Sequence, residues 1–223
     1  MKKLLISSLA ICLALHASAQ YRTSALRTTA PRHGQRATYE TYTGIRIGAM
    51  SSSISADNRE LDADRPKTGL SLGIVRGVQL SPTVPLYFEA GLSYLEKGGK
   101  GYDAENVKYT YSLNYLAIPL LIKYKIAMDY DLSFQPFFGG YLAYGIAGKY
   151  KYYGNGKHAH YTCSSYSDDA FKHFDGGLKI GCGLAIQMFY AEVGYDFGLA
   201  NIEHDDFDRA HNGTVYANIG VNF

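Results

Sequence analysis

Residues 214–223 read Thr-Val-Tyr-Ala-Asn-Ile-Gly-Val-Asn-Phe, so the sequence closes on an alternating stretch with an aromatic end. The odd-numbered positions, from Val215 to Phe223, are apolar, and the even-numbered positions are polar or small or carry Tyr216. A period of two predicts a strand with one apolar and one polar face. Such a strand, ending on Phe, is typical of barrels that span the bacterial outer membrane, where the last strand pairs with the first and leaves no open edge.

The opposite end of the sequence predicts export from the cytoplasm. Residues 1–19 combine two lysines, an apolar stretch over 4–15 and the small residues 17–19, which are the three parts of a secretory signal peptide. The apolar stretch is too short for a membrane-spanning helix, which needs about 20 residues. Residues 20–40 are polar and Arg-rich without periodicity, and we expect a flexible periplasmic segment there.

Charge and composition narrow the class of protein further. Removing residues 1–19 takes away two of the 22 basic residues and none of the 20 acidic ones, so the net charge becomes zero. This balance gives no reason to expect a nucleic-acid partner. The chain has 21 Tyr, 24 Gly and no Trp, and no amphipathic helical pattern follows residue 19. The composition therefore favours an all-β protein.

Alternating segments recur throughout residues 41–223, which we assign to one barrel. The predicted strands cover about residues 42–51, 69–80, 86–97, 112–126, 132–148, 175–188, 190–202 and 214–223. Long connections at 52–68, 98–110, 150–174 and 203–213 alternate with short ones at 81–85, 127–131 and 188–190. This alternation predicts an eight-stranded antiparallel up-and-down transmembrane β-barrel, with long loops outside the cell and short turns in the periplasm. Arg76 breaks the apolar face of its strand, which predicts either a bulge near Gly73 or Gly77 or a different register.

A soluble barrel with its apolar face inside is the structural alternative. Two features favour the membrane barrel, namely the many glycines on the polar faces and the mixed signs of the charges there. A narrow lumen needs paired charges, because an unpaired buried charge is costly. The cations expected inside are Arg46, Lys123, Lys125 and Lys179, and the expected partners are Glu89, Glu192 and Asp196.

One segment resembles a known family. Residues 114–124, Asn-Tyr-Leu-Ala-Ile-Pro-Leu-Leu-Ile-Lys-Tyr, are similar to the Y-L-x-I-P-L-L-x-K-Y signature of PorT-like outer-membrane proteins of the Bacteroidetes. Residues 138–141, 175–177 and 195–202 resemble later blocks of the same family. The resemblance implies an eight-stranded outer-membrane barrel and, for the namesake, a link to protein secretion. It does not imply one activity. Pro119 within the signature predicts a missing ladder donor.

The sequence favours a structural or binding role over catalysis or conduction. Tyrosines suited to contact with an extracellular protein or glycan gather in the longest predicted loop: Tyr150, Tyr152, Tyr153, Tyr161 and Tyr166. Besides outer-membrane lipid, a periplasmic partner for residues 20–40 is the alternative contact. The loop histidines His158, His160 and His204 leave an enzyme or metal site open, but no nucleophile motif or cofactor motif accompanies them. A small pore is disfavoured because side chains fill an eight-stranded lumen.

Overall fold

The computed structural model of the chain describes residues 39–56, 63–102, 108–153, 161–163, 173–200 and 210–223. Ten strands lie within these residues: β1 (Thr41–Ala56), β2 (Ala63–Gln79), β3 (Leu86–Tyr102), β4 (Lys108–Tyr124), β5 (Ile126–Ala127), β6 (Leu132–Tyr153), β7 (Tyr161–Cys163), β8 (Phe174–Ile186), β9 (Phe189–Gly198) and β10 (Ala210–Asn222). Within the described residues, no helix has the length and apolar character needed to cross a membrane.

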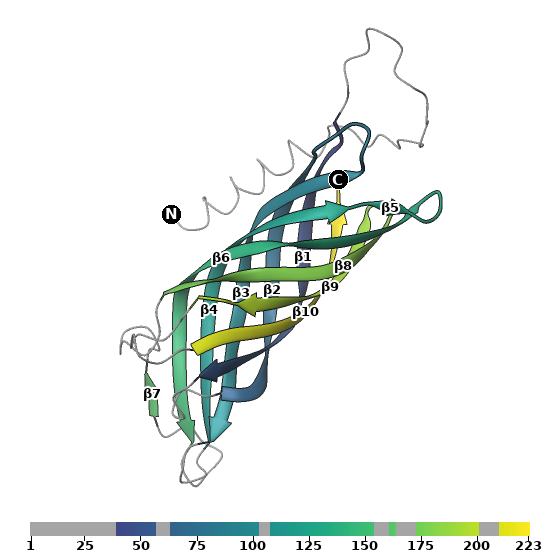
Figure 1. Ribbon diagram of the computed structural model, residues 1–223. Helices are drawn as coiled ribbons and strands as arrows, with labels where there is room; N and C mark the ends of the chain where they lie inside the picture. The colour runs from purple at the N-terminus through teal and green to yellow at the C-terminus, as the bar shows by residue number, and fades with distance from the viewer. Residues whose placement is uncertain (1–38, 57–62, 103–107, 154–160, 164–172, 201–209) are drawn as a thin grey trace, which may run out of the picture. The chain divides into compact units, whose positions relative to one another are not determined.

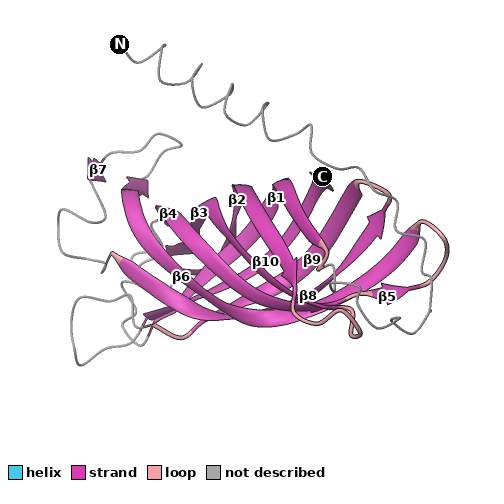
Figure 2. Cartoon of the chain, turned by 90° about the horizontal axis from the view of Figure 1, so that it is seen from above, coloured by secondary structure: helices cyan, strands magenta, loops and turns pink. Residues whose placement is uncertain are grey.

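Eight long strands form a closed antiparallel barrel (Figures 1 and 2). The order around the barrel is β1, β2, β3, β4, β6, β8, β9 and β10, and β10 pairs with β1 from Gly44↔Asn222 to Ala56↔Ala210. The two short strands are additions at opposite ends of β6. The structure thus confirms the predicted eight-stranded antiparallel architecture, including closure through the alternating stretch at residues 214–223.

The two ends of the barrel differ in their connections. Residues 80–85, 125–131 and 187–188 make the close connections at one end, which we call the short-turn end. Gln187 has φ of 53°, which suits the two-residue turn between β8 and β9. The opposite end, called the long-loop end, is where β1 to β4 and β6 extend beyond their predicted limits. The predicted loops at 52–68 and 98–110 were too long, because strands that leave an apolar environment no longer need alternating apolar residues.

The outer surface of the barrel carries the apolar face of each strand. Exposed members include Ile47 on β1, Leu72 on β2, Ile118 on β4 and Val193 on β9, with 46–55% exposure for the last two. The predicted lipid-facing sets are confirmed on all eight long strands. Their alternation follows from the pleat, which sends successive side chains to opposite faces.

Arg76 is the one residue for which both predicted explanations were wrong. The ladder from Ser71 to Gln79 runs without a bulge, and the exposed Arg76 side chain lies on the outward face like its neighbours. Its guanidinium donates a hydrogen bond to the Thr43 hydroxyl at 3.2 Å. Because Arg76 is close to the short-turn end, its long side chain can carry the charge toward water while its stem covers apolar surface.

Two local irregularities matter for the direction of side chains. The β3–β4 ladder is interrupted between Ala90↔Leu120 and Ser93↔Ala117 without a change of register, as expected where Pro119 lacks an N–H. In β6 a bulge inserts one residue, so that Ile146 and Ala147 are both exposed. Beyond the bulge, Ser112↔Lys149 and Thr110↔Lys151 continue the pairing with β4.

Candidate functional site

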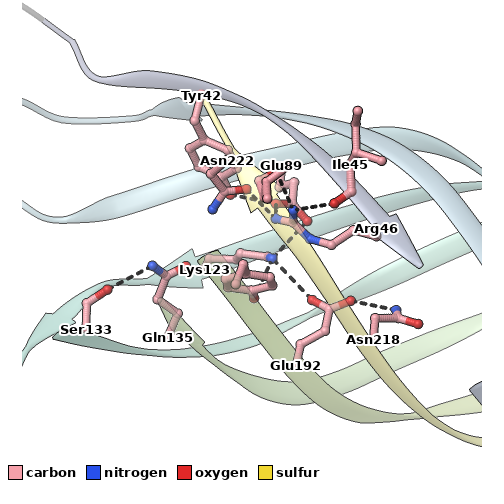
Figure 3. A network of polar contacts seen from close by, with 12 residues as sticks. Tyr42, Ile45, Arg46, Glu89, Lys123, Ser133, Gln135, Glu192, Asn218 and Asn222 are labelled. Atoms are coloured by element: carbon pink, nitrogen blue, oxygen red, sulfur yellow. Dashed lines mark hydrogen bonds and ion pairs between the residues drawn. The ribbon is translucent and has the colours of Figure 1, made fainter. Parts of the chain in front are cut away.

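The lumen contains a cluster of charged side chains near the short-turn end (Figure 3). Lys123 on β4 lies 2.9 Å from the Glu89 carboxylate on β3 and 3.6 Å from the Glu192 carboxylate on β9. Arg46 on β1 lies 3.8 Å from the same Glu89. Four strands therefore direct two cations and two carboxylates toward one point, which confirms the predicted pairing of Arg46 and Lys123 with Glu89 and Glu192.

Neutral hydrogen-bond partners hold each member of this cluster in place. The Tyr42 hydroxyl donates to Glu89 at 2.6 Å, and the Asn218 amide donates to Glu192 at 2.8 Å. The Lys123 ammonium donates to the Tyr190 hydroxyl at 2.9 Å, and the Arg46 guanidinium lies 4.1 Å from the centre of the Tyr190 ring. Since the charges and their partners come from strands all around the barrel, the cluster cross-links the lumen.

A second buried pair, which the sequence did not indicate, joins Lys97 on β3 to Asp175 on β8 at 3.0 Å. Neither side chain has any exposed surface. The Tyr141 hydroxyl contacts both, at 3.2 Å from Lys97 and 3.4 Å from Asp175, and Asn212 donates to Asp175 at 3.1 Å. Both residues of the pair stood at the ends of predicted strands, so only the register across β3, β4, β6 and β8 could have placed them opposite each other.

The remaining predicted lumen cations differ in their environments. Lys179 and Asp196 pair at 2.6 Å as predicted, and the Lys179 ammonium lies 3.7 Å from the centre of the Tyr216 ring. Lys125 was placed wrongly, because its side chain is 41% exposed and pairs with Glu40 at 3.5 Å. Lys125 directly follows the last residue of β4, so it reaches the rim of the short-turn end instead of the lumen.

The space left between these groups is small. One cavity of about 40 Å³ lies in the lumen, lined among others by Arg46, Glu89, Lys179 and Tyr216. This volume has room for a few water molecules and for no larger ligand. Buried tyrosines predicted to fill the lumen do so, since Tyr87, Tyr115 and Tyr141 are at most 5% exposed.

The described residues offer little catalytic chemistry. The carboxylates of Glu89 and Glu192 are engaged by cations and by hydrogen-bond donors. His173 is stacked on Tyr144 and its Nδ1 lies 2.8 Å from the Gly145 carbonyl oxygen. Within the described part of the chain, no three His, Cys, Asp or Glu residues are grouped so as to hold a metal ion. The predicted candidates His158, His160 and His204 lie outside the described residues.

The tyrosines proposed as a binding surface lie largely on strands. The backbones of Tyr150, Tyr152 and Tyr153 belong to β6, and Tyr161 belongs to β7, where it pairs with Tyr152. Tyr166 lies outside the described residues. Within the predicted 150–174 loop, residues 150–153 and 161–163 thus form a β6–β7 ribbon, and residues 154–160 and 164–172 lie outside the described residues.

This ribbon is part of a sheet that extends the barrel at the long-loop end. Tyr144 is the last residue of β6 that pairs with β8. Beyond it β6 continues to Tyr153 and pairs with β4 and β7. The β3–β4 ladder likewise continues to Tyr102↔Lys108. Figure 1 shows the ends of β4 and β6 near β7, at the end opposite β5. We call this part, made of 63–70 of β2, 96–102 of β3, 108–114 of β4, 145–153 of β6 and β7, the sheet extension.

Comparison with known proteins supplies a family. The model of the outer membrane protein beta-barrel domain matches residues 19–203. No curated protein matches the chain. Among solved structures, Ail of Yersinia pestis in complex with the heparin analogue sucrose octasulfate is 14% identical with a TM-score of 0.42, covering 82% of this chain and 99% of that one. Neisserial surface protein A is 13% identical with a TM-score of 0.46, covering 81% and 97%.

Proposed function

The chain belongs to the outer membrane protein beta-barrel domain family, and from that premise we propose that it is a closed barrel that binds an extracellular protein or glycan. Its location is the outer membrane. Two features support a binding role. The lumen is filled by paired charges and tyrosines, which leaves the outer surfaces for function. The sheet extension then offers paired strands on which connecting segments can be presented.

The filled lumen is the single observation that carries this proposal. Eight strands enclose an interior that side chains can occupy completely. Here the ion pairs Lys123–Glu89, Lys97–Asp175 and Lys179–Asp196 link strands across that interior. Solute passage would require separating such pairs in a space of low polarity, which is costly. A role expressed on the outside of the cell agrees better with this interior than transport does.

Orientation follows from the connections. Barrels of this kind place short turns in the periplasm and long loops outside the cell. The sheet extension then faces the exterior, while Glu40 and the other described residues of the short-turn end lie on the periplasmic side. A signal peptide at residues 1–19 and a flexible segment at 20–40 remain part of the proposal, with a periplasmic partner as the second candidate contact.

A role in protein secretion is the alternative that the PorT-like segment at residues 114–124 supports. In the structure this segment forms the last eleven residues of β4, with Ile118 outward and Lys123 in the lumen cluster. The alternation of apolar and polar residues in this segment therefore follows from its place in the barrel wall, with one face toward lipid and one toward the lumen. Secretion would require a periplasmic contact, for which the rim residues Glu40 and Lys125 are the described candidates.

The experiment replaces residues 154–172 with a short Gly-Ser turn that joins β6 directly to β8. The barrel ladders do not include this segment apart from β7, so heat-modifiable migration in detergent gels should be retained. Binding of purified protein to arrayed extracellular glycans and matrix proteins should be lost. The matched control replaces residues 201–209 in the same way. If wild type binds nothing that either replacement removes, the external binding role is wrong.

The enzyme and pore alternatives predict results that differ from those of a binding role. A catalytic role of the loop histidines predicts that His158→Ala, His160→Ala or His204→Ala alone abolishes turnover of a lipid or peptide substrate. A pore predicts steady conductance in planar bilayers. The proposed binding role predicts neither, and a periplasmic role predicts that removing residues 20–38 abolishes partner capture while the external replacements do not.

A further inference from the structure

Basic side chains gather on the outward face of the sheet extension. Arg65 and Lys67 lie on β2, Lys100 on β3, and Lys149 and Lys151 on β6. We call these five residues the basic patch. All are exposed or half-buried, and none of the five forms an ion pair within the described part of the chain. This distinguishes them from the lumen cations, each of which has a carboxylate partner.

The register places Arg65, Lys100, Lys149 and Lys151 on one face. Arg65 is opposite Lys100, Lys100 is opposite Thr110, and Thr110 is opposite Lys151, so one row crosses four neighbouring strands. Directly opposite residues point to the same side of a sheet. Neighbouring strands are about 4.8 Å apart, so this row spans about 14 Å. Thr110, in the middle of the row, is 9% exposed.

Lys67 is opposite the buried Ser52 of β1, next to the point where β2 shifts its register against β3, so its link to the row rests on its contact with Gly98 of β3. A side chain at Gly98 of β3 would meet Lys67 Cδ at 3.2 Å, so the Lys67 stem runs over the space that this glycine leaves open. The Lys67 ammonium is within electrostatic reach of Lys100 and Lys151. Like charges this close repel one another, and a bound anion relieves that repulsion.

Among the side chains that the structure describes, Glu96 supplies a carboxylate near the basic patch. It is already engaged, since it accepts hydrogen bonds from the Leu70 backbone N–H at 3.2 Å and from the Tyr94 hydroxyl at 3.3 Å. A single carboxylate does not neutralise five cations. Among the side chains that the structure describes, the patch therefore carries a net positive charge on the outward face.

The height of the patch relative to the membrane identifies its ligand. On β3 the outward face carries Leu92 and Tyr94, then Glu96 and Gly98, and then Lys100. Six residues separate Tyr94 from Lys100, about 20 Å along the strand. A strand tilt of about 40° reduces this to about 15 Å along the membrane normal. The headgroup region extends about 5–8 Å beyond the hydrocarbon core, so the Lys100 backbone lies above it. The long stems of the outward Lys and Arg side chains can carry their charges back toward the headgroups.

We propose that the basic patch binds the phosphate groups of glycolipids in the outer leaflet of the outer membrane. Lysine ammonium groups are point charges suited to phosphate, and Arg65 adds a planar fork of donors. The Arg65 guanidinium also lies 4.5 Å from the centre of the exposed Tyr102 ring, which positions it. The assignment goes beyond the proposed loop binding, because the patch is on the barrel wall and needs no loop residue.

The test uses the full barrel in detergent micelles with bisphosphorylated lipid A as the probe. Lipid A should raise the unfolding midpoint of wild type, and chemically dephosphorylated lipid A should not. Each basic residue near an anionic surface contributes about a fivefold change in affinity, so Lys100→Gln/Lys149→Gln/Lys151→Gln should weaken lipid A binding on the order of 100-fold. Arg76→Gln is the matched control, because Arg76 is also an outward basic residue but lies near the short-turn end.

Several outcomes would overturn the proposal. Equal lipid A affinity of wild type and the triple variant would show that the patch is not the site. A sulfated soluble oligosaccharide that binds through the same lysines as tightly as lipid A would assign the patch to an extracellular polyanion instead. Should the triple variant fail to fold, the salt dependence of wild-type binding decides, because raising NaCl from about 0.05 to 0.5 M must weaken a phosphate contact. Binding that survives replacement of residues 154–172 separates this site from the loop function.

Discussion

Asp175→Asn removes the negative half of a fully buried ion pair and is the sharpest perturbation of the lumen. Lys97 and Asp175 are 3.0 Å apart, and neither side chain has exposed surface. Breaking a buried pair on one side costs about 3–5 kcal/mol, because the remaining charge stays desolvated. The substituted amide would keep one acceptor oxygen, and Lys97 would keep the Tyr141 hydroxyl at 3.2 Å. We therefore expect a loss near the lower limit, about 3 kcal/mol of the free energy of unfolding.

The measurement is urea unfolding of the refolded barrel in lipid vesicles, followed by far-ultraviolet circular dichroism and by the gel shift of unheated samples. The chain has no Trp, so tryptophan fluorescence offers no signal. Lys125→Gln is the control, because the Lys125–Glu40 pair is about 41% exposed on both sides and such pairs contribute about 1 kcal/mol or less. A double variant, Lys97→Met/Asp175→Asn, should be more stable than the sum of its single losses predicts. If Asp175→Asn costs no more than Lys125→Gln, the pair is solvated and the account of a filled lumen is wrong.

Three further perturbations examine other parts of the barrel. Ile118→Arg places a charge on the lipid face and should lower the free energy of unfolding by about 2–4 kcal/mol. Asn114→Arg, on the same face of β4 but beyond the apolar belt, should lower it by under about 1 kcal/mol. Equal losses in vesicle unfolding would show that the belt is misplaced. A Cβ on Gly139 would overlap the Leu120 carbonyl oxygen, while one on outward Gly140 meets its nearest atom at 3.3 Å. Gly139→Ala should therefore lower stability by about 1–3 kcal/mol and Gly140→Ala by less than about 1 kcal/mol, and the reverse order would contradict the inward assignment of Gly139. Purified wild type in planar bilayers should show no steady single-channel current, and a stable conductance would mean that the lumen pairs open.

The sequence predicts the membrane-spanning part of the barrel well, because there each strand needs one apolar face. Alternation identified the outward sets on β4 and β8 and the inward Glu89, Lys123 and Asp196 without knowledge of the register. Cations and carboxylates of opposite sign on inward faces are expected to pair, and three of the predicted lumen cations do so with the predicted acids.

Two features could not be obtained from alternation alone. The Lys97–Asp175 pair depends on a register summed over four strands, and a shift at any ladder would separate its members. The sheet extension carries polar residues on its outward face, so β3 and β6 gave no alternating signal beyond residues 97 and 148. The basic patch was invisible for the same reason, since its residues come from three strands and meet only through cross-strand pairing.

The contrast between the cations of the lumen and those of the sheet extension indicates where the barrel interacts with its surroundings. Arg46, Lys97, Lys123 and Lys179 each lie within 4 Å of a carboxylate inside the barrel. The five residues of the basic patch have no such partner within the described ranges, although a carboxylate on a neighbouring strand would be easy to provide. Unpaired like charges lower the stability of the folded chain, so their cost is offset when an anion outside the protein binds them. A neutral interior and a positive outer wall are together the expected distribution for a barrel that acts through its outer surface and its surrounding lipid.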